Sequence, residues 1–417
     1  MQRKHVWILT TLALVGMGAW ATGQVAANAA LPNPALNAPN QVSWELFARV
    51  NQPAPGTPPE ANESLWETWA TDEDTFLDPN NARAVPAPTF CRQNPPTVPD
   101  YALRCPVWPG ETYRPETPLD SKQQVVADQS QQGHPHSPPA LQDAPGVPDE
   151  LVYRNRIAFD YIVENGLWYV EGLQDAYFRG FEVSFPLGSI EVKSNWKEIA
   201  ESDKARYHWK RGANGKLYGM TAMHLMSKDL PIWTWQTFEH VDNPGRCDFI
   251  GCHDSFGQVP ADVPPQAVMN RTYPAEQLTP AVLALFERYG VREQFRNYRL
   301  KGSQNEFTDN TGRPTLLGNS VTEQGFVPTS SCTTCHARAS AGMVTQTNRT
   351  IGGRTYTVNV NDRLSVFETT QPLSGSVGSP NPAWYYNSEG RRKLMPMDFV
   401  WAFFNAKSAV PPTPQAP

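Results

Sequence analysis

The sequence lacks the short motifs that anchor several common enzyme chemistries. Its 417 residues contain no G-x-x-x-x-G-K-[ST] phosphate loop, no G-x-S-x-G nucleophile elbow and no H-E-x-x-H zinc motif. Charged residues are few, at 18%, and the balance is acidic, with a net charge of -6. An acidic chain has no electrostatic reason to bind nucleic acid or an anionic membrane surface. Phosphate-loop, serine-hydrolase and zincin functions therefore have no anchor here, and we expect no nucleic-acid partner.

An apolar run near the amino terminus indicates export. Arg3 and Lys4 precede the run at residues 6–20, and small residues follow as far as Ala29. This order is typical of a secretory signal peptide, and the run is too short to span a bilayer comfortably. We expect residues 1–29 to be removed, which takes away two positive charges and leaves a periplasmic chain of net charge -8 without a membrane span. An uncleaved amino-terminal anchor is the alternative.

Cysteine is scarce, at six residues, but two of the six lie in the most informative motif of the chain. Cys332-Thr333-Thr334-Cys335-His336 has the C-x-x-C-H spacing by which a c-type haem is attached. Thiols three residues apart reach two vinyl groups of one porphyrin, and the adjacent imidazole can ligate the iron. The motif predicts one covalent haem c on Cys332 and Cys335, with His336 as the metal ligand. The alternatives are a redox dithiol, a structural disulfide or a zinc site, but neither the βαβ pattern of a redox dithiol nor the second ligand pair of a zinc site surrounds the motif.

The four other cysteines leave two interpretations open. In an oxidising compartment they predict two disulfides, and local pairing of Cys91 with Cys105 and of Cys247 with Cys252 is the simplest arrangement. However, Cys247, Cys252 and His253 also have C-x4-C-H spacing, a rarer form of haem attachment. This alternative would make the protein dihaem.

The ligand that occupies the sixth coordination position of the iron distinguishes an electron carrier from a haem enzyme. Met395 and Met397 lie about sixty residues after His336, which is enough chain to pass around a porphyrin. Met395 is favoured because residues 394–396, which end in proline, are expected to be extended. His224, in an apolar strand pattern, is the competing ligand. The alternative for each of these three residues is a place in the core without iron ligation.

The remaining pattern predicts an α+β fold. The 40 prolines, about twice the average share, indicate a loop-rich chain. Period-two alternation predicts the strands of a mostly antiparallel sheet at residues 189–193, 219–226 and 231–241. Spacing by three and four predicts helices at residues 42–48, 151–170, 280–298, 336–344 and 397–406. A helix at residues 336–344 would place Met343 on the same face as His336, which argues against Met343 as the sixth ligand.

These elements suggest two parts after the signal peptide. We predict a β-rich body with helices and long loops over residues 30–320, and a helical, haem-binding carboxy-terminal part over residues 321–417 packed on that body. The haem would then lie between the two parts.

Several strings also resemble a bacterial family labelled cytochrome c family protein. They span the chain from about residue 40 to residue 405, and the most distinctive is the tryptophan-rich string at residues 233–243. The others are Arg154-Asn155-Arg156 with Phe159-Asp160-Tyr161-Ile162, residues 189–193 and residues 331–336. The resemblance implies an exported monohaem c-type cytochrome and carries no substrate with it.

Taken together, the sequence predicts a periplasmic protein that carries electrons through one haem to and from an unidentified redox partner. A haem oxidoreductase, peroxidase-like and with a substrate cavity in the β-rich body, is the alternative. Chain length favours this alternative somewhat, because a simple carrier needs far fewer residues.

Overall fold

A computed structural model describes most of the chain after the expected signal peptide. The described residues are 33–56, 58, 62–77, 106–109, 149–212, 214–266, 270–344, 350–351, 354–355, 357–359 and 377–408. Residues 1–29 and the expected Cys91–Cys105 pair lie outside them. Within the described ranges, none of the helices has the length and apolar character needed to cross a bilayer.

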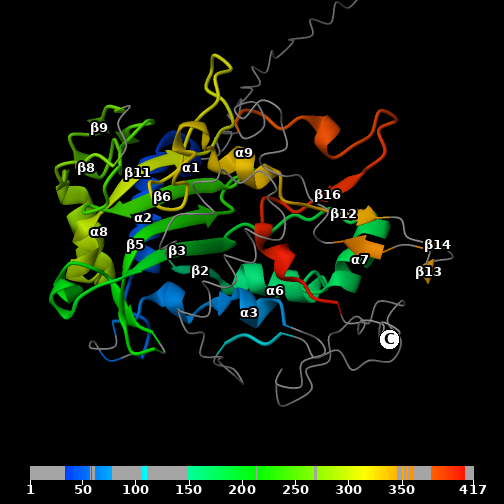
Figure 1. Cartoon of the computed structure of the whole chain (residues 1–417), viewed down its shortest axis with the longest axis horizontal. Helices are drawn as coiled ribbons and strands as arrows, with labels where there is room; N and C mark the ends of the chain where they lie inside the picture. Colours follow the sequence, from blue (N-terminus) through cyan, green and yellow to red (C-terminus); the bar gives the residue numbers. More distant parts are fainter. Residues whose placement is uncertain are drawn as a thin grey trace, which may run out of the picture. The chain divides into compact units, whose positions relative to one another are not determined.

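A seven-stranded antiparallel sheet is the largest element of the fold (Figure 1). The strands predicted at residues 189–193, 219–226 and 231–241 overlap the sheet strands at Ile190–Glu198, Leu217–Ser227 and Thr234–His240. The expectation of an α+β fold with an antiparallel sheet is confirmed. Strand β4 (Trp209–Arg211) pairs with β5 beside the main path. The order along that path is β1 (Ala70–Thr71), β2 (Asp149–Arg154), β3 (Ile190–Glu198), β5 (Leu217–Ser227), β6 (Thr234–His240) and β11 (Tyr298–Gln304).

Short pairs of strands and single helical turns make up much of the remainder. The described two-stranded sheets join β7 (Cys252–His253) with β9 (Asp262–Val263), β8 (Gln258–Val259) with β10 (Gln277–Leu278), and β13 (Thr350–Ile351) with β14 (Arg354–Thr355). The short helices and 3-10 turns are α1 (Pro34–Asn37), α3 (Asp72–Thr75), η2 (Leu65–Thr68), η3 (Glu201–Ala205), η4 (Glu293–Asn297), η5 (Val327–Thr329) and η6 (Pro382–Trp384). This pattern agrees with the loop-rich chain that the prolines predict.

Helices α2 (Pro39–Val50) and α8 (Pro280–Tyr289) contribute to the apolar core on one face of the sheet. In α2 the buried side chains Trp44, Phe47 and Ala48 follow the spacing of three and four that predicts a helix here. Phe47 stacks on Phe238 of β6 at a ring distance of 4.2 Å. Aromatic side chains therefore form much of this core.

The opposite face of the sheet carries hydrogen-bonding and charged side chains. Strand alternation and register place Lys193 of β3 beside His224 of β5, and His224 beside Thr237 of β6. Two residues further along the same strands, Met226 of β5 lies beside Trp235 of β6. We refer to this side as the polar face; its defining residues are Glu150, Lys193, His224, Thr237, Glu239 and Lys301.

Two of the predicted helices are shorter than expected. The pattern at residues 151–170 spans strand β2 and helix α6 (Arg156–Glu164), which begins where the Asn155 side chain accepts the N–H of Ala158. Helix α7 (Val170–Phe178) then follows. Helix α8 ends at Tyr289 because Gly290 adopts a left-handed conformation with φ of 63°. Strand pairing and one glycine therefore set the helix boundaries, which the spacing of apolar residues did not indicate.

The carboxy-terminal part is less helical than predicted. Helix α9 (Cys332–Ala337) is followed by strand β12 (Ser340–Val344), so the prediction of a helix across residues 336–344 is wrong. Strand β12 pairs with β15 (Thr357–Asn359) and with β16 (Leu394–Pro396). The helix predicted at residues 397–406 is only the 3-10 turn η7 (Trp401–Asn405). Met343 lies in β12, and the helical-face argument against it as a ligand therefore fails.

The two predicted parts share one core. The described residues from Pro34 onward belong to one compact unit. A buried cluster in it contains Trp233 and Trp235 from the body together with Cys332, Met395 and Met397 from the carboxy-terminal part. The segment that follows the C-x-x-C-H motif is therefore packed in the same core as side chains of the sheet.

Replacing Trp44 with alanine should lower the free energy of unfolding by about 3–5 kcal/mol, because it leaves a cavity in the aromatic core. Trp44 is 0% exposed, and its indole N–H donates to Asp254 at 2.7 Å. Urea denaturation of the processed protein measures the change. Leu187→Ala is the control, since Leu187 is 74% exposed and the expected effect is within about 0.5 kcal/mol. An unchanged Trp44→Ala midpoint would contradict this account of the core.

Candidate haem-attachment site

Helix α9 presents the C-x-x-C-H motif in its first turns. The Ser331 hydroxyl caps the helix by accepting the N–H of Thr334 at 3.5 Å. The N–H of Thr333 donates to the Gln304 side chain of β11 at 3.1 Å. Because residues three apart lie on the same side of a helix, Cys332 and Cys335 project from one side of α9. The sheet and the cap together fix the start of the motif.

Both thiols of the motif are unpaired in the structure. Cys332 is buried and its Sγ–H donates to the Leu317 carbonyl at 3.5 Å, while Cys335 is partly accessible. Burial raises the pKa of the Cys332 thiol well above its usual range and that of Cys335 to about 12. A redox dithiol needs a thiol with a lowered pKa. The environment of these two cysteines therefore does not favour the dithiol alternative.

The imidazole of His336 is held by a backbone carbonyl. Its Nδ1 lies 2.8 Å from the carbonyl oxygen of Phe399, and its ring packs against Trp235 at a centroid distance of 4.5 Å. Burial lowers the pKa of His336 to about 3, so the ring is neutral and its one N–H is the Nδ1–H donated to Phe399. Nε2 therefore carries a lone pair, and no donor among the described residues bonds to it. Histidines that ligate metals are typically oriented by such a bond.

The turn that supplies this carbonyl has an unusual backbone. Asp398 and Phe399 adopt positive φ angles of 47° and 71°, which side chains other than glycine rarely adopt. The Asp398 carboxylate accepts a hydrogen bond from the Lys228 ammonium at 2.6 Å and another from the N–H of Phe185 at 2.7 Å. These buried contacts hold the turn, and the turn points its carbonyl at His336.

The residues of the motif fit a c-type haem. Two protonated, unpaired thiols lie on one side of a helix, and the adjacent neutral imidazole offers an unprotonated nitrogen. Cys332, Cys335 and His336 would hold the group. This chemical complementarity and the Phe399 contact make the motif a candidate haem-attachment site.

Met395 and Met397 lie in the core next to the motif. Their side chains are 0% and 1% exposed, and both belong to the apolar cluster that contains Cys332. The extended conformation expected around Met395 is confirmed, because Met395 lies in β16 opposite Ala341 of β12. The N–H of Met397 donates to the Ala339 carbonyl at 2.9 Å. Pairing of β12 with β16 therefore returns both methionines to the segment that follows α9.

His224 is engaged in hydrogen bonds that compete with iron ligation. The Asn319 side-chain oxygen accepts the N–H groups of Val321 and Thr322, which directs its amide N–H₂ toward His224 Nε2 at 2.9 Å. Burial lowers the pKa of His224 to about 3, so Nε2 is the unprotonated acceptor of that bond. The contacts therefore favour a hydrogen-bonded histidine over an iron ligand.

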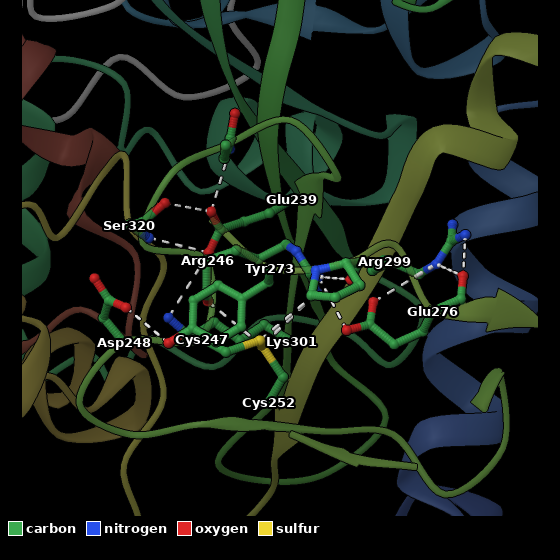
Figure 2. Close-up of a disulfide and its surroundings, with 12 residues drawn as sticks. Glu239, Arg246, Cys247, Asp248, Cys252, Tyr273, Glu276, Arg299, Lys301 and Ser320 are labelled. Atoms are coloured by element: carbon green, nitrogen blue, oxygen red, sulfur yellow. Dashed lines mark hydrogen bonds and ion pairs between the residues drawn. A yellow bond between two sulfur atoms is a disulfide. The ribbon is translucent and has the colours of Figure 1, made fainter. Parts of the chain in front are cut away.

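Cys247 and Cys252 form a disulfide (Figure 2). The bond consumes both sulfur atoms that a second haem would need for its thioethers, so the structure favours the disulfide of the two alternatives. His253 is exposed and bonds the carboxylate of Asp262. Buried Arg246 lies 3.6 Å from the Cys247 sulfur and pairs with Glu276 at 3.0 Å. The disulfide belongs to a small apolar cluster with Tyr273, and the buried Arg246–Glu276 ion pair lies beside it.

Sequence reasoning missed a charged group beside the motif. The Glu323 carboxylate lies 3.6 Å from His224 Nε2, and the Lys193 ammonium pairs with Glu150 at 2.8 Å. Thr237, the neighbour of His224, is two residues along β6 from the Trp235 that contacts His336, a separation of about 7 Å. The strand alternation around Lys193 and His224 was a weak signal. Glu323 lies in a turn region without a periodic pattern and gave none.

Comparison of the chain with protein-family models, curated proteins and solved structures found no match. Any functional proposal therefore rests on the motif and on the contacts made by its residues. Of these contacts, the bond between His336 and Phe399 is the most specific.

Replacing Cys247 and Cys252 together with alanine should leave the haem content per chain unchanged, because their sulfur atoms are bonded to each other. The same variant should lose about 2–4 kcal/mol of unfolding free energy, a typical contribution of a disulfide. Intact mass and a pyridine haemochrome assay measure the haem, and urea denaturation measures the stability. Loss of one haem mass would restore the dihaem alternative.

Proposed function

We propose that the protein is an exported, periplasmic c-type cytochrome that carries one haem on Cys332 and Cys335, with His336 as an iron ligand. The observation that carries the proposal is the neutral His336 imidazole, fixed through its Nδ1–H by the Phe399 carbonyl at 2.8 Å. The amino-terminal pattern supports export, and a disulfide is compatible with an oxidising compartment. The resemblance to the cytochrome c family points the same way.

Each residue of the site has a distinct part in this function. The two thiols attach the group, and the Phe399 carbonyl selects the His336 tautomer and increases the basicity of its Nε2. Trp235 packs on the imidazole and limits its rotation. When bound, a c-type haem supplies one-electron oxidation and reduction. A redox partner that donates or accepts single electrons is therefore implied.

A haem oxidoreductase is the second candidate, and the polar face favours it. Four charged or titratable side chains beside the motif remain partly exposed. The exposed fraction is 33% for Lys193, 17% for Glu150, 16% for His224 and 14% for Glu323. Partly accessible charged groups next to a redox centre can contact a substrate or exchange protons. Electron transfer alone does not require them.

Protein purified from a host that matures c-type cytochromes should show a Soret band and the mass of the processed chain plus one haem. A Cys332→Ala/Cys335→Ala variant should lack both, because it has no sulfur to form the thioethers. The Cys247→Ala/Cys252→Ala variant is the matched control and should keep both. Wild-type protein with the mass of the bare processed polypeptide would refute the proposed function.

Met395→Leu should remove the weak far-red sulfur-to-iron band of the ferric protein and lower its midpoint potential, since methionine raises the potential of a c-type centre. Leucine keeps the buried volume, so the stability cost should stay below about 1.5 kcal/mol. Met397→Leu is the matched control, because Met397 is equally buried in the same cluster. A band that persists in Met395→Leu and disappears in Met397→Leu would assign the ligand to Met397 instead.

A further inference from the structure

Glu323 lies over the polar face in the turn region at residues 319–326. One carboxylate oxygen, Oε2, accepts the N–H of Asn319 at 2.6 Å, and the other, Oε1, lies 3.6 Å from His224 Nε2. The side chain is 14% exposed. The carboxylate is therefore fixed within the protein and still reached by solvent.

The stem of Glu323 packs against the segment that contacts the haem motif. A Cβ on Gly318 would lie 3.2 Å from Glu323 Cγ and 2.5 Å from the Ser330 hydroxyl, so the absence of a side chain at Gly318 makes room for both. The preceding residue, Leu317, accepts the thiol hydrogen of Cys332. Glu323 is thus separated from a haem-attaching cysteine by one packed segment of backbone.

Charges from the surrounding elements act on Glu323. Lys193 of β3 and Lys301 of β11 stabilise its carboxylate, as does the N–H of Asn319, whereas Glu239 of β6 disfavours it. His224 of β5 is neutral because its pKa is low. Burial outweighs the two lysines and raises the pKa of Glu323 to about 7.

The carboxylate is electrostatically coupled to the motif. After burial, the charge of Glu323 is the next largest influence that raises the pKa of the Cys332 and Cys335 thiols on α9. Coupling free energies are reciprocal. A charge placed at these sulfur atoms therefore changes the protonation free energy of Glu323 as much as the charge of Glu323 changes that of the thiols. A negative charge added at the haem site therefore disfavours the Glu323 carboxylate.

We infer that Glu323 is the proton-exchanging group of the haem site. It takes up one proton from water when the attached haem receives one electron from a one-electron donor, and it releases that proton on oxidation. The electron reduces ferric to ferrous iron and the proton joins a carboxylate oxygen, so the net charge of the site stays constant. This inference rests on the proposed function and extends it, because it couples electron transfer to proton transfer at a named residue.

The midpoint potential of the purified haem protein, measured by spectroelectrochemistry between about pH 5 and about pH 9, tests the inference. Where the carboxylate is ionised in the oxidised protein and protonated in the reduced protein, the potential should fall as pH rises through neutrality. The steepest slope should approach 59 mV per pH unit, because a tenfold change in one proton concentration corresponds to 59 mV for one electron. Glu323→Gln should remove this slope.

Two further variants make the test specific. Glu293→Gln is the matched control; the Glu293 side chain is 74% exposed, and the variant should keep the wild-type slope. Lys193→Met removes a cation that lowers the pKa of Glu323. The sloping region should therefore move to higher pH in Lys193→Met, a readout that does not depend on the folding of Glu323→Gln.

The outcomes distinguish this inference from the function on which it rests. A preparation without haem would overturn both. A haem protein whose potential does not change with pH near neutrality, or a slope that persists in Glu323→Gln, would overturn the role of Glu323 and leave the c-type assignment intact. An unshifted sloping region in Lys193→Met would likewise count against Glu323.

Discussion

The fold depends on an antiparallel sheet whose two faces are buried by different kinds of interaction. Aromatic and aliphatic side chains around α2 and α8 need only exclude water from one face. Charged side chains on the polar face can be buried only where hydrogen bonds and ion pairs replace their hydration. Glu239 is fully buried and accepts a hydrogen bond from the N–H of Ser320 (Figure 2). It also accepts one from the side-chain amide of Asn243. The bonds that satisfy this charge also hold the turn at residues 319–326 over the sheet.

A second constraint orients the imidazole of the motif. Positive φ angles at two residues that are not glycine cost on the order of 1–3 kcal/mol each. The contact of the buried Asp398 carboxylate with Lys228 holds the turn in this conformation and keeps the Phe399 carbonyl directed at His336. Lys228 directly follows β5, so the sheet itself positions a ligand of the proposed haem. Under the proposed function, the strained turn would serve to orient the iron ligand.

Under the proposed function, the polar face would connect electron transfer with proton transfer in one arrangement. Lys193, His224 and Glu323 lie close to the row of side chains that contacts His336, and each retains some accessible surface. Burying such groups costs free energy, so their presence is better explained by function than by stability. The same groups would serve an electron carrier that exchanges protons and an oxidoreductase that also binds a substrate. Both candidate functions would use the same haem site. They differ in whether only protons or also a substrate would reach the polar face.

The sequence by itself determined the features whose causes are local. These are the spacing of the C-x-x-C-H motif, the alternation of β3, β5 and β6, and the apolar spacing of α2. It did not determine where α9 ends, because residues Ser340–Val344 form a strand that pairs with the distant β16. Only the tertiary structure decided that a carbonyl at Phe399 holds His336 and that Glu323 lies beside the motif. The physical reason is that these contacts join residues that are not neighbours in any periodic pattern, and their geometry depends on the packing of the whole sheet.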